Sequence, residues 1–150
     1  MTNALRTYLA YGSNLDAAQM RRRCPSARLI APVELTGYRL AFAGYSRRWD
    51  GGVATLVRDP KRSVPALLYE LEEDDERRLD GFEGCPGAYT KRTRRVLGRG
   101  RGGRSAFFYV QPARKTTRPA LEYLLVIARA YREHGFDIRP LVRAANGAKS

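Results

Sequence analysis

The chain has 150 residues, a length that fits one domain able to bury roughly two-thirds of its unfolded surface. It carries 28 Lys and Arg against 15 Asp and Glu, for a net charge of +13. No apolar run has membrane-spanning length, and residues 1–6 lack the apolar core of a signal peptide, so we expect a cytoplasmic protein. Cys24 and Cys85 are isolated from each other, and the single His134 leaves no cluster for zinc. We therefore expect reduced, structural thiols and no zinc site.

The first half of the chain is predicted to be rich in strands. Apolar or β-branched segments are expected as strands over residues 7–10, 27–33, 38–43, 52–57 and 64–71. Asn14 or Asp16 can cap a helix that ends at about Arg23. Turns are expected at Thr36-Gly37 and at Asp59-Pro60, each separating two of the strands.

The second half is predicted to alternate between helices and a hairpin. Residues 72–80 begin acidic and end basic, which suits the dipole of a short helix. Residues 89–97 and 105–111 are predicted as a hairpin whose tip is the glycine–arginine segment 98–104. Apolar residues recur at helical spacing over 120–134, before Gly135. Residues 146–150 are expected to form a frayed tail, and the whole chain, 1–150, is predicted to be one α+β domain with a curled or barrel-like β core.

The first candidate functional segment joins the first strand to the first helix. It consists of Tyr11, Gly12, Ser13, Asn14 and Leu15. Glycine allows a sharp turn and a close approach of a ligand, and the helix start offers unpaired N–H donors to a carboxylate or carbonyl oxygen. The alternative is an ordinary strand–helix turn with a polar cap. A covalent role for Ser13 is not expected, because the chain has no G-x-S-x-G motif and its one histidine lies near the C-terminus.

The second candidate is Glu83, which lies among glycines and apolar residues in the segment 81–87. Such surroundings can raise the pKa of a carboxyl toward neutrality, and a glycine-rich loop can expose it to a cleft. The alternative is an ordinary surface glutamate. Asp80, one helical turn earlier, is expected to orient or cap the loop. Four tyrosines lie at element ends or on strands: Tyr11, Tyr89, Tyr109 and Tyr123. Such tyrosines are usually core residues whose hydroxyl reaches solvent, and the hydroxyl can also donate a hydrogen bond to a bound carboxylate.

Positive charge gathers in the third quarter of the chain. From Gly84 to Leu121 there is no Asp or Glu, whereas ten basic residues occur there. Such a field attracts anionic substrates, acidic proteins or nucleic acid. The segment 98–104, GRGRGGR, resembles an RNA-binding arginine–glycine stretch, but it is a single short copy without the G-K-[ST] ending of a P-loop. Binding of RNA or another polyanion through Arg92–Arg104 is therefore an alternative to a solvated hairpin.

Together the two candidate segments resemble the γ-glutamylcyclotransferase family. Its members have a strand ending in Tyr-Gly-Ser-Asn-Leu, followed later by Leu-Asp-x-x-Glu-Gly and Gly-x-Tyr. This chain has the first motif at Tyr11–Leu15, the second at Leu79–Gly84 and the third at Gly87–Tyr89. The segments Trp49–Leu56 and Pro119–Tyr123 are also similar, so the resemblance covers roughly residues 7–137.

The resemblance implies a small mixed β-barrel with flanking helices and a cofactor-free enzyme. It implies that Glu83 is the general acid and base, and that the turn Tyr11–Leu15 holds the γ-glutamyl group largely through backbone donors. Tyr89 and Tyr123 match positions that approach the substrate in relatives. The substrate's own α-amine then attacks the γ-glutamyl carbonyl and releases 5-oxoproline and an amine. The implied partner is a small γ-glutamyl compound, anionic or carrier-bound, and a non-catalytic binding domain of the same fold is a further alternative.

Overall fold

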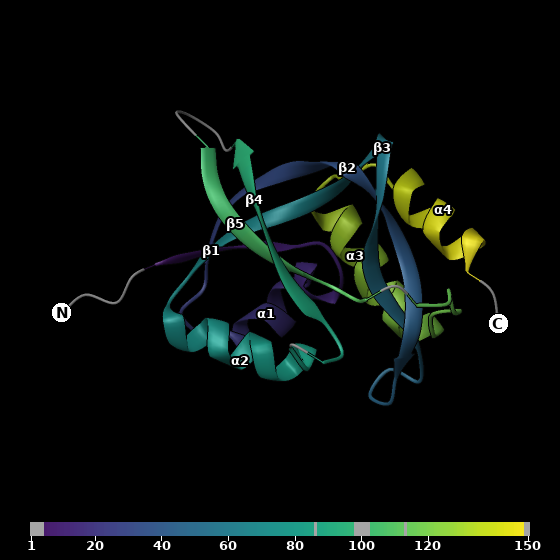
Figure 1. The fold of residues 1–150 in the computed structure, drawn as a ribbon, viewed down its shortest axis with the longest axis horizontal. Helices are drawn as coiled ribbons and strands as arrows, with labels where there is room; N and C mark the ends of the chain where they lie inside the picture. Colours follow the sequence, from purple (N-terminus) through teal and green to yellow (C-terminus); the bar gives the residue numbers. More distant parts are fainter. Residues whose placement is uncertain (1–4, 86, 98–102, 113, 149–150) are drawn as a thin grey trace.

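The computed structural model describes residues 5–85, 87–97, 103–112 and 114–148. Its strands are β1 (Arg6–Ala10), β2 (Arg28–Ser46), β3 (Gly51–Leu71), β4 (Thr90–Leu97) and β5 (Gly103–Val110). Its helices are the 3₁₀ turn η1 (Ser13–Leu15), α1 (Ala17–Arg23), α2 (Glu73–Glu83), α3 (Leu121–Glu133) and α4 (Arg139–Gly147). The strands form one curled sheet in the order β2-β3-β1-β5-β4, which confirms the α+β class (Figure 1). Because β2 and β4 are its two edges, the sheet is open, and the expected barrel describes it only loosely.

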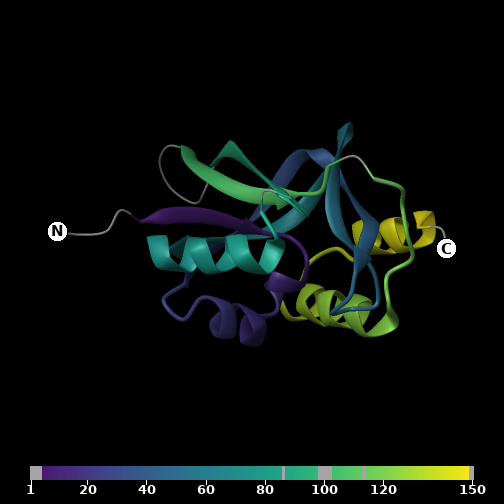
Figure 2. The same ribbon diagram turned by 60° about the horizontal axis from the view of Figure 1, so that its bottom comes forward.

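The helices divide into two groups along the sheet. Figure 2 shows α2 directly below β1, with α1 beneath it, while α3 and α4 lie at the other end of the long β2–β3 ribbon. The core fills the space between sheet and helices with fully buried side chains such as Leu9, Phe42, Phe108 and Ile127. The two candidate segments lie between these two groups of helices. The first follows the end of β1, and the second begins at the end of α2.

Two predicted turns are irregularities inside long strands. β2 and β3 pair antiparallel from Arg28 opposite Glu70 to Ser46 opposite Gly51. The expected turn at 36–37 lies within β2, and the expected turn at 59–60 lies within β3, where residues 59–62 form a bulge. The prediction of four separate strands here was wrong, because glycine, aspartate and proline serve bulges as well as reversals. Pairing with the neighbouring strand decides whether such residues form a bulge or a chain reversal.

The predicted helix starts and stops are partly confirmed. Asp16, not Asn14, is the N-cap of α1, and its carboxylate accepts a hydrogen bond from the Gln19 N–H at 3.0 Å. Helix α2 extends three residues beyond the expected end, so Glu83 is its last helical residue rather than a loop residue. Helix α3 is confirmed, with Gly135 following it in the left-handed conformation.

The C-terminal helix α4 was not predicted. It packs on β2 and buries Leu141 and Ala144. It includes Asn146 and Gly147, which were expected in a frayed tail, while residues 149–150 lie outside the described part. A helix of nine residues is too short to be stable by intrinsic propensity alone, so its contact with β2 stabilises it.

The remaining predictions concern the hairpin and the thiols. The β4–β5 hairpin is confirmed, with Thr90 opposite Val110 at its base. Of the predicted tip 98–104, residues 98–102 lie outside the described part, and residues 103 and 104 belong to β5. Cys24 and Cys85 are both free thiols, and Cys24 is buried. Within the described ranges, no helix combines the length and apolar character needed to cross a membrane.

Candidate active site

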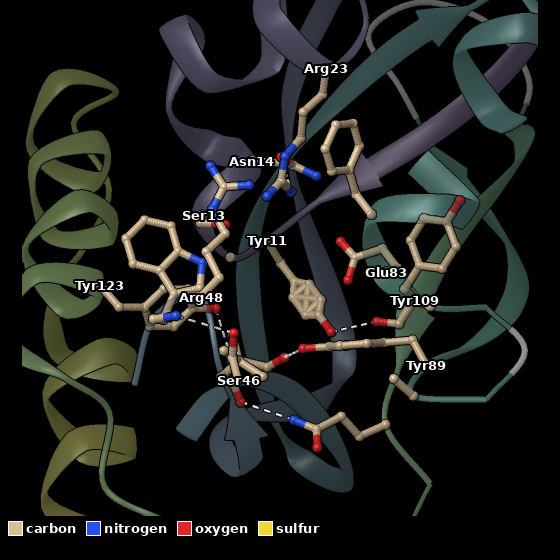
Figure 3. A pocket seen from close by; sticks show the side chains of 18 of the residues that line it. Tyr11, Ser13, Asn14, Arg23, Ser46, Arg48, Glu83, Tyr89, Tyr109 and Tyr123 are labelled. Carbon is tan, nitrogen blue, oxygen red and sulfur yellow. Dashed lines mark hydrogen bonds between the residues drawn. The ribbon is translucent and has the colours of Figure 1, made fainter. Parts of the chain in front are cut away.

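A cavity of about 430 Å³ opens where the two sequence motifs meet. It is lined by all but one of the predicted site residues: Tyr11, Gly12, Ser13, Asn14, Glu83, Tyr89 and Tyr123. The exception is Leu15, whose side chain is fully buried in the core. Figure 3 shows Glu83, Tyr11 and Arg23 pointing into the same space from different elements. The fold thus brings together segments about 70 residues apart in the chain.

Glu83 presents a carboxylate with altered acidity to this cavity. Its side chain is half-buried at the end of α2. Burial raises the pKa of Glu83 to about 7, and the positive charge of Arg23 acts in the opposite direction. A carboxyl group with a pKa near neutral pH can both take up and release a proton during one reaction cycle.

Gly84 ends α2 immediately after Glu83. Its φ angle is 63°, in the left-handed region, and its N–H and that of Cys85 donate to the carbonyl of Asp80. A Cβ atom at Gly84 would lie 3.0 Å from Cβ of Ala88. Glycine therefore allows the helix to stop at this point without strain, which leaves Glu83 at the cavity wall.

The turn after β1 approaches β3 very closely. Its 3₁₀ geometry is closed by the Leu15 N–H, which donates to the Gly12 carbonyl at 3.0 Å. A Cβ atom at Gly12 would lie 3.1 Å from Cβ of Ala54 and 3.5 Å from the hydroxyl of Tyr123. Only glycine lets the backbone of this turn form part of the cavity wall without displacing those neighbours.

Three tyrosine hydroxyls are held in defined directions. The Ala54 N–H donates to the Tyr123 hydroxyl oxygen at 2.9 Å, and the Tyr89 hydroxyl donates to the Ala54 carbonyl at 2.7 Å. The Tyr11 hydroxyl donates to the backbone carbonyl of Tyr109. No acceptor for the Tyr123 proton is found among the described residues, whereas Tyr11 and Tyr89 donate their protons to backbone carbonyls and retain lone pairs. Burial raises the pKa of all three hydroxyls, so they stay protonated.

The Asn14 side chain supports the turn from within. Its Oδ1 accepts hydrogen bonds from Gln19 Nε2 at 2.9 Å and from Arg23 Nη1 at 3.1 Å, while its Nδ2 donates to the Tyr8 hydroxyl at 2.9 Å. The amide of Gln19 also reaches the Ser13 hydroxyl at 2.8 Å. Both acceptor positions of the Asn14 carbonyl are thus occupied by protein donors.

Sequence reasoning did not select several residues that line the cavity: Arg23, Arg48, Trp49 and Gln111. Trp49 packs 5.0 Å from the ring of Tyr123, and Gln111 donates to the carbonyls of Ala43 and Val53 at 2.9 and 3.0 Å. A signal existed only for Trp49, in the segment similar to the cyclotransferase family. Arg23 resembled one more basic residue in the last turn of a helix, where cations complement the dipole.

Asp80 was expected to orient or cap the loop, and its backbone carbonyl accepts the N–H groups of Gly84 and Cys85. Its carboxylate accepts a hydrogen bond from the Tyr109 hydroxyl at 2.6 Å and forms an ion pair with Lys91 at 2.9 Å. It does not line the cavity. The Asp80 side chain therefore holds Tyr109 and the end of α2 in place from behind.

Comparison with known proteins places the chain in a family. The family model for "Gamma-glutamyl cyclotransferase, AIG2-like" matches residues 8–125, which include every residue of the cavity named above. The chain belongs to this family. It is accordingly an enzyme of the γ-glutamylcyclotransferase type.

Individual relatives agree with the family assignment. The gamma-glutamylcyclotransferase of Mus musculus is 29% identical over 133 residues, which cover 85% of this chain and 71% of that protein. The Homo sapiens protein of the same name is 26% identical over 136 residues, covering 87% and 72%. A solved structure titled "Gamma-glutamyl cyclotransferase" has a TM-score of 0.85 at 22% identity, covering 97% of this chain and 89% of the other. At that identity the structural match supports the fold alone.

Proposed function

We propose that the protein converts γ-glutamyl amides to 5-oxoproline and a free amine, with Glu83 as general acid and base. The observation that carries the proposal is the position of Glu83 in the cavity with a pKa of about 7. The same carboxyl can then accept a proton from the attacking amine and return it to the leaving amine.

The reaction needs proton transfer and positioning, both of which the cavity can supply. The α-nitrogen of the substrate forms a bond to the γ-carbonyl carbon, and the bond from that carbon to the leaving nitrogen breaks. Two protons leave the α-ammonium group, and both end on the departing amine. Because nucleophile and carbonyl belong to one molecule, holding the γ-glutamyl chain in a curled conformation contributes much of the rate.

The tyrosines and the turn supply the remaining contacts in this proposal. Tyr123 is the hydroxyl whose proton has no acceptor among the described residues, and it donates to the γ-carbonyl oxygen as negative charge develops there. Tyr11 and Tyr89 accept hydrogen bonds from the α-amine. Backbone N–H groups of the turn Tyr11–Leu15, other than that of Leu15, which donates to the Gly12 carbonyl, complete the enclosure of the γ-glutamyl group. A cavity of about 430 Å³ is in the range of small-molecule sites, which favours a substrate of dipeptide size.

A reducing compartment suits this proposal. Cys24 and Cys85 are free thiols, as expected for a cytoplasmic enzyme. The polyanion alternative is weakened by Arg94 and Arg104, because they bond within the fold to Thr36 and to Glu70.

The substitution Glu83→Gln tests the mechanism. Wild-type protein and variant are incubated with γ-glutamyl dipeptides, glutathione and γ-glutamylamines, and 5-oxoproline is measured by mass spectrometry. We expect the wild type to form product from at least one compound and the variant to be slower by about 1000-fold, since general acid–base catalysis contributes that much.

Glu73→Gln is the matched control, because Glu73 is exposed at the other end of α2 and should keep wild-type turnover. Circular dichroism establishes that both variants are folded. A Glu83→Gln protein with wild-type turnover would exclude Glu83 as the acid and base. A folded wild type that forms no product from any of these compounds would favour the non-catalytic binding domain.

A further inference from the structure

The cavity has an excess of positive charge. The charged residues that line it are Arg23, Arg48, Arg114 and Glu83. Arg48 and Arg114 are exposed, but Arg23 is only 7% exposed. Arginine is rarely buried to this extent unless an anion neutralises it.

Arg23 has hydrogen-bonding capacity to spare. Its Nη1 donates to Asn14 Oδ1 at 3.1 Å, and its guanidinium carbon lies 4.7 Å from the ring centroid of Phe82. Its Nε is buried without a hydrogen-bond partner among the described residues. A buried donor of a charged group that lacks a partner is costly, and Nε itself is closed to the cavity. An acceptor bound at the part of the guanidinium that lines the cavity would therefore compensate the buried charge.

Arg23 and Glu83 influence each other without an ion pair between them in the described structure. The negative charge of Glu83 raises the pKa of Arg23, although burial and the neighbouring charge of Arg48 lower it by more. Figure 3 shows the Arg23 guanidinium beside Asn14, with the Glu83 carboxylate directed into the same cavity from the end of α2. The two opposite charges therefore face a common space.

We propose that Arg23 binds the α-carboxylate of the substrate's γ-glutamyl group, while Glu83 receives the α-ammonium group. This inference rests on the proposed function. An α-amino acid carries both charges on one carbon, so a cation and an anion that line the same cavity bind it in a single orientation. That orientation delivers the amine to the residue that must deprotonate it. Asn14 then acts as a positioning residue that holds the guanidinium, rather than as a ligand of the substrate.

The proposal predicts selection against substrates that lack the α-carboxylate. The test uses γ-glutamylalanine and its analogue in which only the glutamyl α-carboxylate is replaced by a carboxamide. For the wild type we expect kcat/KM to fall about 100-fold with the carboxamide, the loss typical of an unpaired buried charge. For Arg23→Gln we expect the carboxylate substrate to lose a similar factor and the two substrates to become equal within about threefold.

Two further variants separate charge from structure. Arg23→Lys keeps the charge but not the planar donors, and should recover part of the preference for the carboxylate. Arg22→Gln removes a neighbouring exposed arginine of the same helix and should behave as the wild type. If Arg23→Gln slows both substrates equally, or slows neither, Arg23 does not bind the α-carboxylate.

Calorimetry separates this inference from the proposed reaction. In the Glu83→Gln background, γ-glutamylalanine should bind about 100-fold more tightly than the carboxamide, and adding Arg23→Gln should remove the difference. A wild type without turnover whose Glu83→Gln variant retains this preference would overturn the reaction but support the carboxylate site. Turnover of both substrates by the wild type at equal kcat/KM would support the reaction and overturn the carboxylate site.

Discussion

At the scale of single residues, Glu83 shows how surroundings give an ordinary carboxyl its chemistry. Its pKa of about 7 arises from burial, which penalises the charged form, and Arg23 offsets only part of that effect. Gly84 ends α2 directly after Glu83 and so leaves this carboxyl at the cavity wall. Gly12 approaches β3 closely and adds no side chain that would occupy the cavity.

The acidity of Glu83 predicts the pH dependence of turnover. Because Glu83 must be ionised to accept the first proton, kcat/KM should be constant above about pH 7 and fall tenfold per pH unit below it. The profile is measured with γ-glutamylalanine between pH 5 and 9, with circular dichroism to exclude unfolding. A profile that stays flat down to pH 5 would show that the essential base is a group with an ordinary carboxyl pKa.

Glu83 should also make the folded protein less stable at neutral and higher pH. Its folded pKa of about 7 exceeds the value of about 4.3 expected in the unfolded chain. The folded state therefore binds this proton more tightly, and that stabilisation is complete below the unfolded pKa and is lost as the pH rises through 7. Glu83→Gln should raise the free energy of unfolding at pH 8 by on the order of 3 kcal/mol, because each pKa unit corresponds to about 1.4 kcal/mol.

Urea denaturation of wild type and Glu83→Gln at pH 8 and pH 5 measures this difference. The advantage of the variant should shrink by most of its value at pH 5, where the wild-type carboxyl is already protonated in the folded state. An advantage that is the same at both pH values would have to come from packing rather than from charge.

At the scale of helices and strands, a charge cluster joins α2 to the β4–β5 hairpin. Lys91 on β4 donates to Glu76 and pairs with Asp80 at 2.9 Å, and these two carboxylates lie one turn apart on α2. Glu76 also pairs with Arg6 on β1 at 2.7 Å. Asp80 receives the Tyr109 hydroxyl from β5. The cluster therefore fixes the helix that ends in the proposed catalytic residue.

Replacing Lys91 should destabilise the fold through like-charge repulsion. In Lys91→Met, Glu76 and Asp80 remain close together without their shared cation, and the free energy of unfolding should fall by about 2 kcal/mol, less than for a fully buried pair because Lys91 is partly exposed. Urea denaturation at pH 7 measures the loss. The control is Arg92→Met, the exposed neighbour on β4, for which a change within about 0.5 kcal/mol is expected. Equal stability of the two variants would mean that the cluster contributes nothing to holding α2.

At the scale of the whole molecule, the net charge of +13 should draw anionic substrates toward the enzyme. We expect kcat/KM for γ-glutamylglutamate, which carries a net charge of −2, to fall roughly fivefold when salt rises from about 0.02 to 0.2 M. The kcat value should change little, because screening affects encounter rather than the bound state. The control substrate is γ-glutamylethylamide, which has no net charge and should show little salt dependence. The same dependence for both substrates would exclude electrostatic steering.

Local signals predicted much of the structure and part of the site. The hairpin, α3 and the cap of α1 depend on residues near one another in sequence, so periodicity and turn chemistry suffice for them. The long strands β2 and β3 were missed because their bulges use turn residues, and α4 was missed because its stability comes from contact with β2. Glu83 was selected correctly as a cavity residue but was placed in a loop rather than at a helix end.

By itself the sequence determined the α+β class, the two motifs that indicate the family, and the candidate Glu83. Those features reside in spacing and residue type, which are already present in the unfolded chain. Only the tertiary structure decided that Arg23 and Glu83 line the same cavity, that Asn14 holds Arg23, and that the Tyr123 hydroxyl accepts the Ala54 N–H. These properties arise from contacts between α1, α2, β3 and α3, and burial and hydrogen-bond direction exist only once the chain has closed around the cavity.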